Sequence, residues 1–100
     1  MTTRFGVREE PSYEEARAKL GIEVKRLDEV LEGVVWAIAR GADDETVCPE
    51  VLDGIRLIKA QLPGGTGSLR VWLVVEADSM QACLIWIDID EPSAEEDESW

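Results

Sequence analysis

Three acidic residues at the end of the last apolar run, Asp88, Asp90 and Glu91, form the group best placed by type and spacing to bind a metal ion. Mg²⁺ and Mn²⁺ prefer oxygen ligands, and residues two apart on a strand point to the same side. Arg70 is expected to neutralise Asp88, however, and no further ligand completes the coordination shell. We therefore predict no metal site.

The sequence lacks the residues that several other kinds of catalytic or cofactor site require. The chain has no histidine, which excludes Ser–His and Cys–His nucleophile pairs, and two cysteines without histidine do not form a zinc site. The glycine-rich stretch 64–68 lacks a lysine and leads into a predicted strand, whereas a phosphate loop precedes a helix N-terminus. We predict no cofactor, and we expect Cys83 to be a small core residue rather than half of a disulfide with Cys48.

The run from Leu69 to Asp90 must be buried and is predicted to form a β-hairpin. Leu69–Glu76 and Cys83–Asp90 both alternate in character with period two, which is typical of strands, and a turn over 77–81 separates them. A turn centred on Ser79 sets the register. The partners expected on the two faces are Arg70–Asp88, Trp72–Trp86, Val74–Leu84, Val71–Ile87, Leu73–Ile85 and Val75–Cys83.

One face of this hairpin carries two tryptophans beside an expected ion pair. Trp72 and Trp86 then lie next to Arg70 and Asp88, whereas the opposite face is aliphatic and better suited to pack against helices. Two interpretations remain open: the tryptophan face is part of a core covered on both sides, or it is a platform for a partner. Under the second, Trp72, Trp86 and Asp88 are the predicted partner-binding residues.

The first half of the chain is predicted to form one strand and two helices. The strand covers Thr2–Arg8; Ser12, with Glu15 completing a capping box, starts a short helix that ends at Gly21. A longer helix over about Ile22–Arg40 buries an apolar stripe. The stripe consists of Leu20, Val24, Leu27, Leu31, Val34 and Ile38.

This order of elements predicts an α+β fold. Ala42–Asp53 is expected to be an acidic loop and Gly54–Ala60 a strand that precedes the hairpin. The chain therefore reads as strand, helix, helix and a three-stranded antiparallel meander, with the helices packed on one face of the sheet. Residues 1–91 form one domain, and 92–100 form an acidic disordered tail.

The charge of the chain is strongly negative, with 22 acidic and 10 basic residues and a formal net charge of −12. Five of the acids lie in residues 91–100, which contain no base. Such a field repels phosphate backbones and favours basic partners, although it is also explained by solubility alone. No apolar segment suits a signal peptide or a membrane span, so we expect a cytoplasmic protein without membrane contact.

The layout and several segments resemble the RelE/ParE superfamily of toxin–antitoxin toxins. The segments are a leucine-rich helix, KRLDEVLEGVVWAIARG, then GIRLIKA, LRVWLVVEAD and a closing LIWIDID. The likeness covers about residues 2–90. It implies a messenger-RNA interferase that acts on the ribosome, or a protein that poisons DNA gyrase.

The resemblance also implies catalytic positions. Members that cleave RNA use basic residues on the sheet to hold the phosphate, and the matching residues here are Arg56, Lys59 and Arg70. No base follows Arg70, and the only tyrosine, Tyr13, falls in the first helix. Three scattered cations in an acidic chain are a poor means of stabilising phosphate charge. Enzymatic activity is therefore left open; if present, it is that of an mRNA interferase-like endoribonuclease.

Two functions from different classes follow. The first is a RelE/ParE-like protein acting on translation or replication, weak or inactive as a ribonuclease, with an antitoxin-like partner and the ribosome or gyrase as target. The alternative is an acidic protein-interaction module, such as an inhibitor, an immunity-type protein or a nucleic-acid mimic, that binds a basic partner. A homodimer joined through the tryptophan face is a third arrangement.

Overall fold

The computed structural model describes residues 4–20, 24–62 and 67–90 and confirms the α+β class. The predicted tail, Gly21 and the start of the second helix lie outside these ranges, as do Thr2 and Thr3. In chain order the elements are β1 (Gly6–Glu9), α1 (Pro11–Ala18), α2 (Val24–Gly41), β2 (Glu50–Leu52), β3 (Ile55–Gln61), β4 (Ser68–Glu76) and β5 (Gln81–Asp90).

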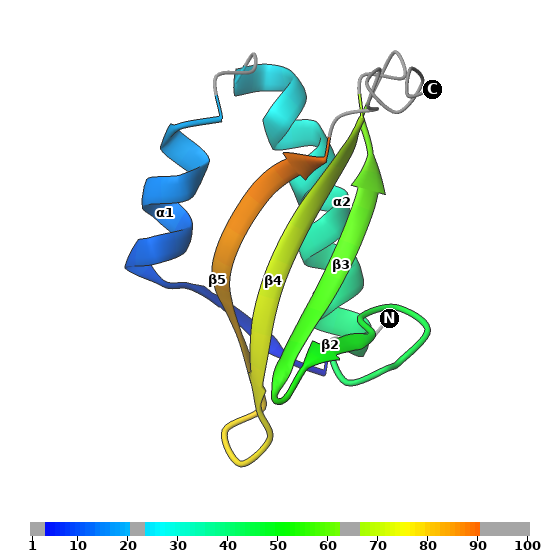
Figure 1. Cartoon of the computed structure of the whole chain (residues 1–100). Coiled ribbons are helices and arrows are strands. Elements are labelled where there is room, and N and C mark those ends of the chain that lie inside the picture. Colours follow the sequence, from blue (N-terminus) through cyan, green and yellow to red (C-terminus); the bar gives the residue numbers. More distant parts are fainter. Residues whose placement is uncertain (1–3, 21–23, 63–66, 91–100) are drawn as a thin grey trace, which may run out of the picture.

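The sheet is mixed and has five strands in the order β1-β5-β4-β3-β2 (Figure 1). The predicted meander of β3, β4 and β5 forms its centre, but a description with three meander strands is incomplete. β1 pairs parallel to β5, and β2 pairs antiparallel to β3 within the stretch predicted to be a loop. The two-residue turn between β2 and β3 is Asp53-Gly54, where Gly54 adopts φ +79° at no steric cost.

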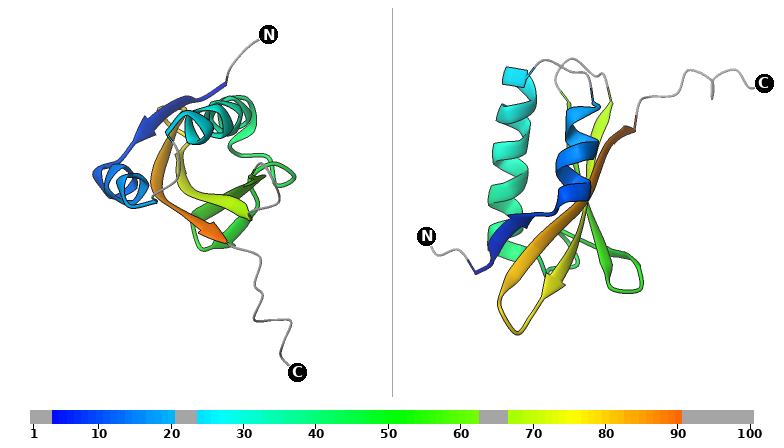
Figure 2. Two further views of the ribbon diagram at one scale, coloured as in Figure 1. Left: turned by 90° about the horizontal axis from the view of Figure 1, so that it is seen from above. Right: turned by 90° about the vertical axis from the view of Figure 1, so that its left-hand side faces the viewer.

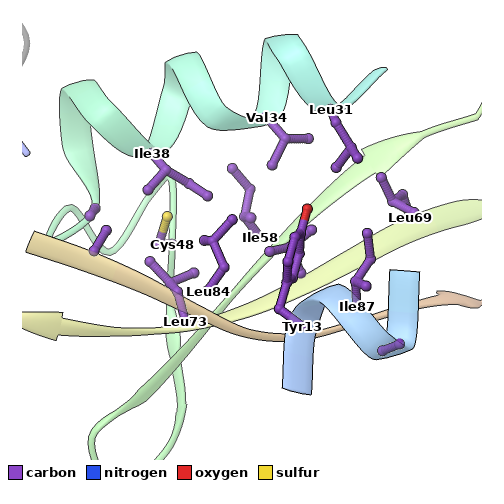
Figure 3. Close-up of a cluster of buried hydrophobic side chains, with 14 of the residues drawn as sticks. Tyr13, Leu31, Val34, Ile38, Cys48, Ile58, Leu69, Leu73, Leu84 and Ile87 are labelled. Atoms are coloured by element: carbon purple, nitrogen blue, oxygen red, sulfur yellow. The ribbon is translucent and has the colours of Figure 1, made fainter. Parts of the chain in front are cut away.

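α2 packs on one face of the sheet, and α1 packs beside β5 (Figure 2). The predicted stripe of α2 is confirmed over its described part, where Leu27, Leu31, Val34 and Ile38 are buried. They pack onto the aliphatic face of β4 and β5 in one cluster, to which α1 adds Tyr13 (Figure 3). Among the described residues, no helix is long and apolar enough to cross a membrane.

The β4–β5 register matches the prediction at one end and departs from it at the other. Arg70 faces Asp88 and Trp72 faces Trp86, as expected, but Leu73 faces Leu84 because a bulge at Ile85 shifts the register. The expected Leu73–Ile85, Val74–Leu84 and Val75–Cys83 pairs are therefore wrong. The turn has one residue fewer than predicted, since Gln81 already pairs with Glu76, and the bulge absorbs the difference.

The bulge turns the Leu84 side chain into the core, and a residue of α1 satisfies the backbone carbonyl of the bulged Ile85. Leu84 is fully buried, whereas Ile85 is only partly buried. The Ser12 hydroxyl donates a hydrogen bond to the Ile85 carbonyl at 2.6 Å. The prediction that Ser12 is the N-cap is therefore wrong. The helix begins at Pro11, Glu10 occupies the N-cap position, and no side chain caps the helix.

This register predicts that two adjacent residues, Leu84 and Ile85, contribute very differently to stability. Leu84→Ala should lower the free energy of unfolding by about 2–5 kcal/mol, because it leaves a cavity in the core. Ile85→Ala should cost about 1 kcal/mol, since the side chain is partly exposed. Urea denaturation of the two variants measures both values. A larger loss for Ile85→Ala would mean that the bulge is absent.

Candidate functional site

The face of the sheet turned away from both helices, here called the outer face, is the candidate site. Side chains alternate along a strand, so the neighbours of buried Ile58, Val71 and Ile87 point to this face. Cross-strand pairing then arranges them in rows that run over β3, β4 and β5. Two rows matter: Leu57, Trp72 and Trp86 form an apolar row, and Lys59, Arg70 and Asp88 form a charged row.

The apolar row is open to solvent at one end. Trp72 is partly buried, and the Trp86 side chain is 46% exposed although it is one of the largest apolar side chains in the chain. No described helix lies over the outer face of β4 and β5 (Figure 1). Large rigid aromatic groups exposed beside polar ones are typical anchors of protein interfaces. The assignment of Trp72, Trp86 and Asp88 to partner binding stays a prediction.

Arg70 is engaged on two sides. Its Nε and Nη2 atoms donate to the two Asp88 carboxylate oxygens at 2.8 and 3.1 Å, as the sequence predicts. The guanidinium also lies 5.0 Å from the centre of the Trp72 ring. The hydrogen bond to Asp88 raises the pKa of Arg70 above its ordinary value. Arg70 therefore organises the face more readily than it binds an incoming phosphate.

Arg56 lies on the opposite face from the other two predicted catalytic residues. It is two residues from buried Ile58 and three from Lys59, so it points to the helix-covered side. Its Nη1 atom donates to the Cys48 carbonyl at 2.8 Å and to Glu45 at 3.2 Å. Arg56 thus fastens the loop before β2 to the sheet, which is a structural role that the sequence did not indicate.

Only Lys59 retains an unengaged positive charge at this site. It is exposed, and within the described part of the chain it forms no salt bridge. The row of Lys59, Arg70 and Asp88 therefore has a net charge of about +1 at neutral pH. A single unpaired lysine beside two indoles is a poor means of stabilising the charge of a reacting phosphate.

The described residues hold neither a metal-binding cluster nor a thiol with a lowered pKa. The described residues contain no cluster of three or more Asp, Glu, Cys or His side chains able to hold a metal ion. Cys48, in the loop before β2, and Cys83, on β5, are free and buried. Burial raises the pKa of the Cys48 thiol to about 11. A thiol that remains protonated at neutral pH is a poor nucleophile.

The Arg70–Asp88 pair should contribute modestly to stability. A double-mutant cycle with Arg70→Ala and Asp88→Ala should give a coupling energy of about 0.5–1 kcal/mol, because both side chains remain about one-third exposed. Urea denaturation of the four proteins provides the value. The coupling should shrink in high salt. Zero coupling at low salt would show that the two side chains do not interact in solution.

Comparison with known proteins gives one informative result. No model of a known protein family matches the chain, and no curated protein sequence matches it. Among solved structures it is similar to a chain of the toxin–antitoxin complex RelBE2 from Mycobacterium tuberculosis, with 14% identity and a TM-score of 0.66. The match covers 90% of this chain and 95% of that chain. The resemblance noted from the sequence is therefore confirmed at the level of the fold, which this chain shares with that chain of the RelBE2 complex.

Proposed function

We propose that the chain is a RelE/ParE-like protein of a toxin–antitoxin-type system, which acts on translation or replication by binding and is weak or inactive as a ribonuclease. The shared fold supports the first part, since the similar solved chain belongs to a complex of a toxin with an antitoxin. One observation supports the second part: Arg56 lies across the sheet from Lys59 and Arg70.

Cleavage of RNA requires several positive groups that converge where phosphate charge develops. Here the sheet separates Arg56 from Lys59 and Arg70, and the Arg70 guanidinium is already bound to Asp88. A single lysine then remains in a chain of net charge −12, which repels a polyanion at long range. The chemistry of the site therefore favours recognition of a protein surface over catalysis on RNA.

The outer face provides the surface for such recognition. Trp86 presents an exposed indole next to Trp72, and Asp88 offers a carboxylate to a donor on the partner. We infer that an antitoxin-like protein or a basic protein docks here. The ribosome and gyrase are the targets that the resemblance implies.

Induced expression in a bacterium tests this proposal. The chain should arrest growth without ribosome-dependent cleavage of messenger RNA, measured by primer extension on transcripts from the arrested cells. Trp86→Ala should relieve the arrest, because it removes the exposed anchor. Leu52→Ala is the matched control, since Leu52 is 62% exposed but lies on β2, away from the indoles. Cleavage that disappears in Lys59→Ala and Arg70→Ala would refute the binding-only proposal.

The alternative is an acidic interaction module, and the charge of the chain favours it. Under this alternative, induction leaves growth unaffected, and the purified chain binds a purified basic nucleic-acid-binding protein with an affinity that falls steeply as salt rises. Competition by duplex DNA would identify a nucleic-acid mimic. Sedimentation at two concentrations tests the separate prediction that two copies associate through the outer face, with Trp86→Ala expected to abolish association.

A further inference from the structure

A second surface feature lies on the helical side of the sheet. A hollow of about 950 Å³ opens between α1 and α2, and Glu9 at the end of β1 also lines it. Its volume lies within the range of ordinary ligand sites. The residues at its base are apolar: Leu31 is buried and Val35 partly buried. The exposed Trp36 lines it as well, with the Arg40 guanidinium 4.8 Å from its ring centre.

One residue that lines this hollow carries a buried hydroxyl without a partner. Tyr13 lines the hollow, is 0% exposed, and its Oη atom has no hydrogen-bond partner. Figure 3 shows the ring reaching from α1 toward α2, with the hydroxyl at its far end. Burial raises the pKa of Tyr13 to about 12, so the phenol keeps its proton at neutral pH. Unsatisfied buried hydroxyls are costly and uncommon, and this one points to a missing polar group.

The wall of the hollow is negatively charged. It contains four carboxylates and one guanidinium, and Arg17 is paired with Asp28 at 2.5 Å. Among the described side chains, Glu9, Glu29 and Glu32 take part in no salt bridge. The net charge of the wall is therefore about −3 at neutral pH. The C-terminal residues 91–100 contain five acids and no base, so like-charge repulsion argues against them as the occupant.

We propose that the hollow between α1 and α2 binds a basic segment of a partner protein. An aliphatic side chain of that segment packs over Leu31 and Val35, lysine or arginine groups meet Glu29 and Glu32, and a polar group satisfies Tyr13. Charge complementarity selects this occupant over an acidic or purely apolar one. The inference rests on the proposed action through a protein partner, and it adds where a partner docks and what chemistry it carries.

A defined peptide tests the proposal. The probe is a fluorescein-labelled amphipathic peptide of leucine and lysine, about 15 residues long so that it can form a helix. The matched peptide replaces each lysine with glutamate. Fluorescence anisotropy should show binding of the first peptide and none of the second. Amide shifts in ¹⁵N-labelled protein should map to α1 and α2, and shifts confined to β3–β5 would overturn the proposal.

Two double variants separate a site from general attraction. Glu29→Gln with Glu32→Gln should weaken binding of the basic peptide by about tenfold, whereas Glu14→Gln with Glu15→Gln should change it less than twofold. Both pairs move the net charge from −12 to −10, since each removes two acids, and Glu14 and Glu15 are exposed on α1 outside the hollow. Equal losses in the two double variants would mean that no defined site exists.

Tyr13→Phe provides an independent readout. Removing an unsatisfied hydroxyl should raise the Tm of the free chain by about 4–8 °C. The substitution should also lower the affinity for the basic peptide by about fivefold, because the hydroxyl no longer bonds to the occupant. If the affinity for the peptide did not change, the proposed bond between the Tyr13 hydroxyl and the occupant would be refuted.

Spermidine is the control for a small polycation. If spermidine displaced the labelled peptide as strongly as unlabelled peptide does, the proposal of a protein segment would be overturned in favour of a small polycation. Growth arrest and its loss in Trp86→Ala do not involve the peptide. A failed peptide experiment with intact arrest therefore rejects the hollow alone.

Discussion

The pairing of β4 with β5, interrupted by one bulged residue, decides which surfaces of this chain are covered and which remain open. On the inner side it places Leu73, Leu84 and Ile87 beneath α2, where each is at most 1% exposed. On the outer side it sets Trp72 directly against Trp86. Ser12 binds the carbonyl at the bulge, so the position of α1, and with it the hollow beside α2, depends on the same irregularity.

Alternation along a strand limits what the outer face can do. Because Arg56 and Lys59 are three residues apart on β3, their side chains leave the sheet on opposite sides and cannot serve one phosphate. The guanidinium of Arg70 is in turn hydrogen-bonded to the Asp88 carboxylate. A RelE-like fold therefore does not imply RNA cleavage here, since activity depends on the site and not on the architecture.

Much of the fold was predictable, because it follows from local patterns. Period-two alternation located β4 and β5, and the spacing of Leu27, Leu31 and Ile38 located the buried side of α2. β2 was missed because its three residues are all exposed and carry no such pattern, although Asp53-Gly54 is a typical hairpin turn. The bulge and the parallel pairing of β1 arise from contacts between distant segments, which leave no local signal.

The candidate site was predictable to a similar extent. The Arg70–Asp88 and Trp72–Trp86 pairs followed from the expected register, and the opposite orientation of Arg56 follows from counting along β3. The hollow could not be anticipated. It depends on how α1 sits beside α2, and on the burial of Tyr13 between them, which only the assembled structure shows.

The parallel pairing of the first strand with the last has a consequence for biosynthesis. Arg8 and Cys83 are 75 positions apart, so β1 has no strand to join until β5 has been synthesised. Contacts this distant in sequence close late and slow the folding of small domains. A nascent chain therefore emerges from the ribosome with its first strand unpaired, and the sheet is completed only after β5 has emerged as well.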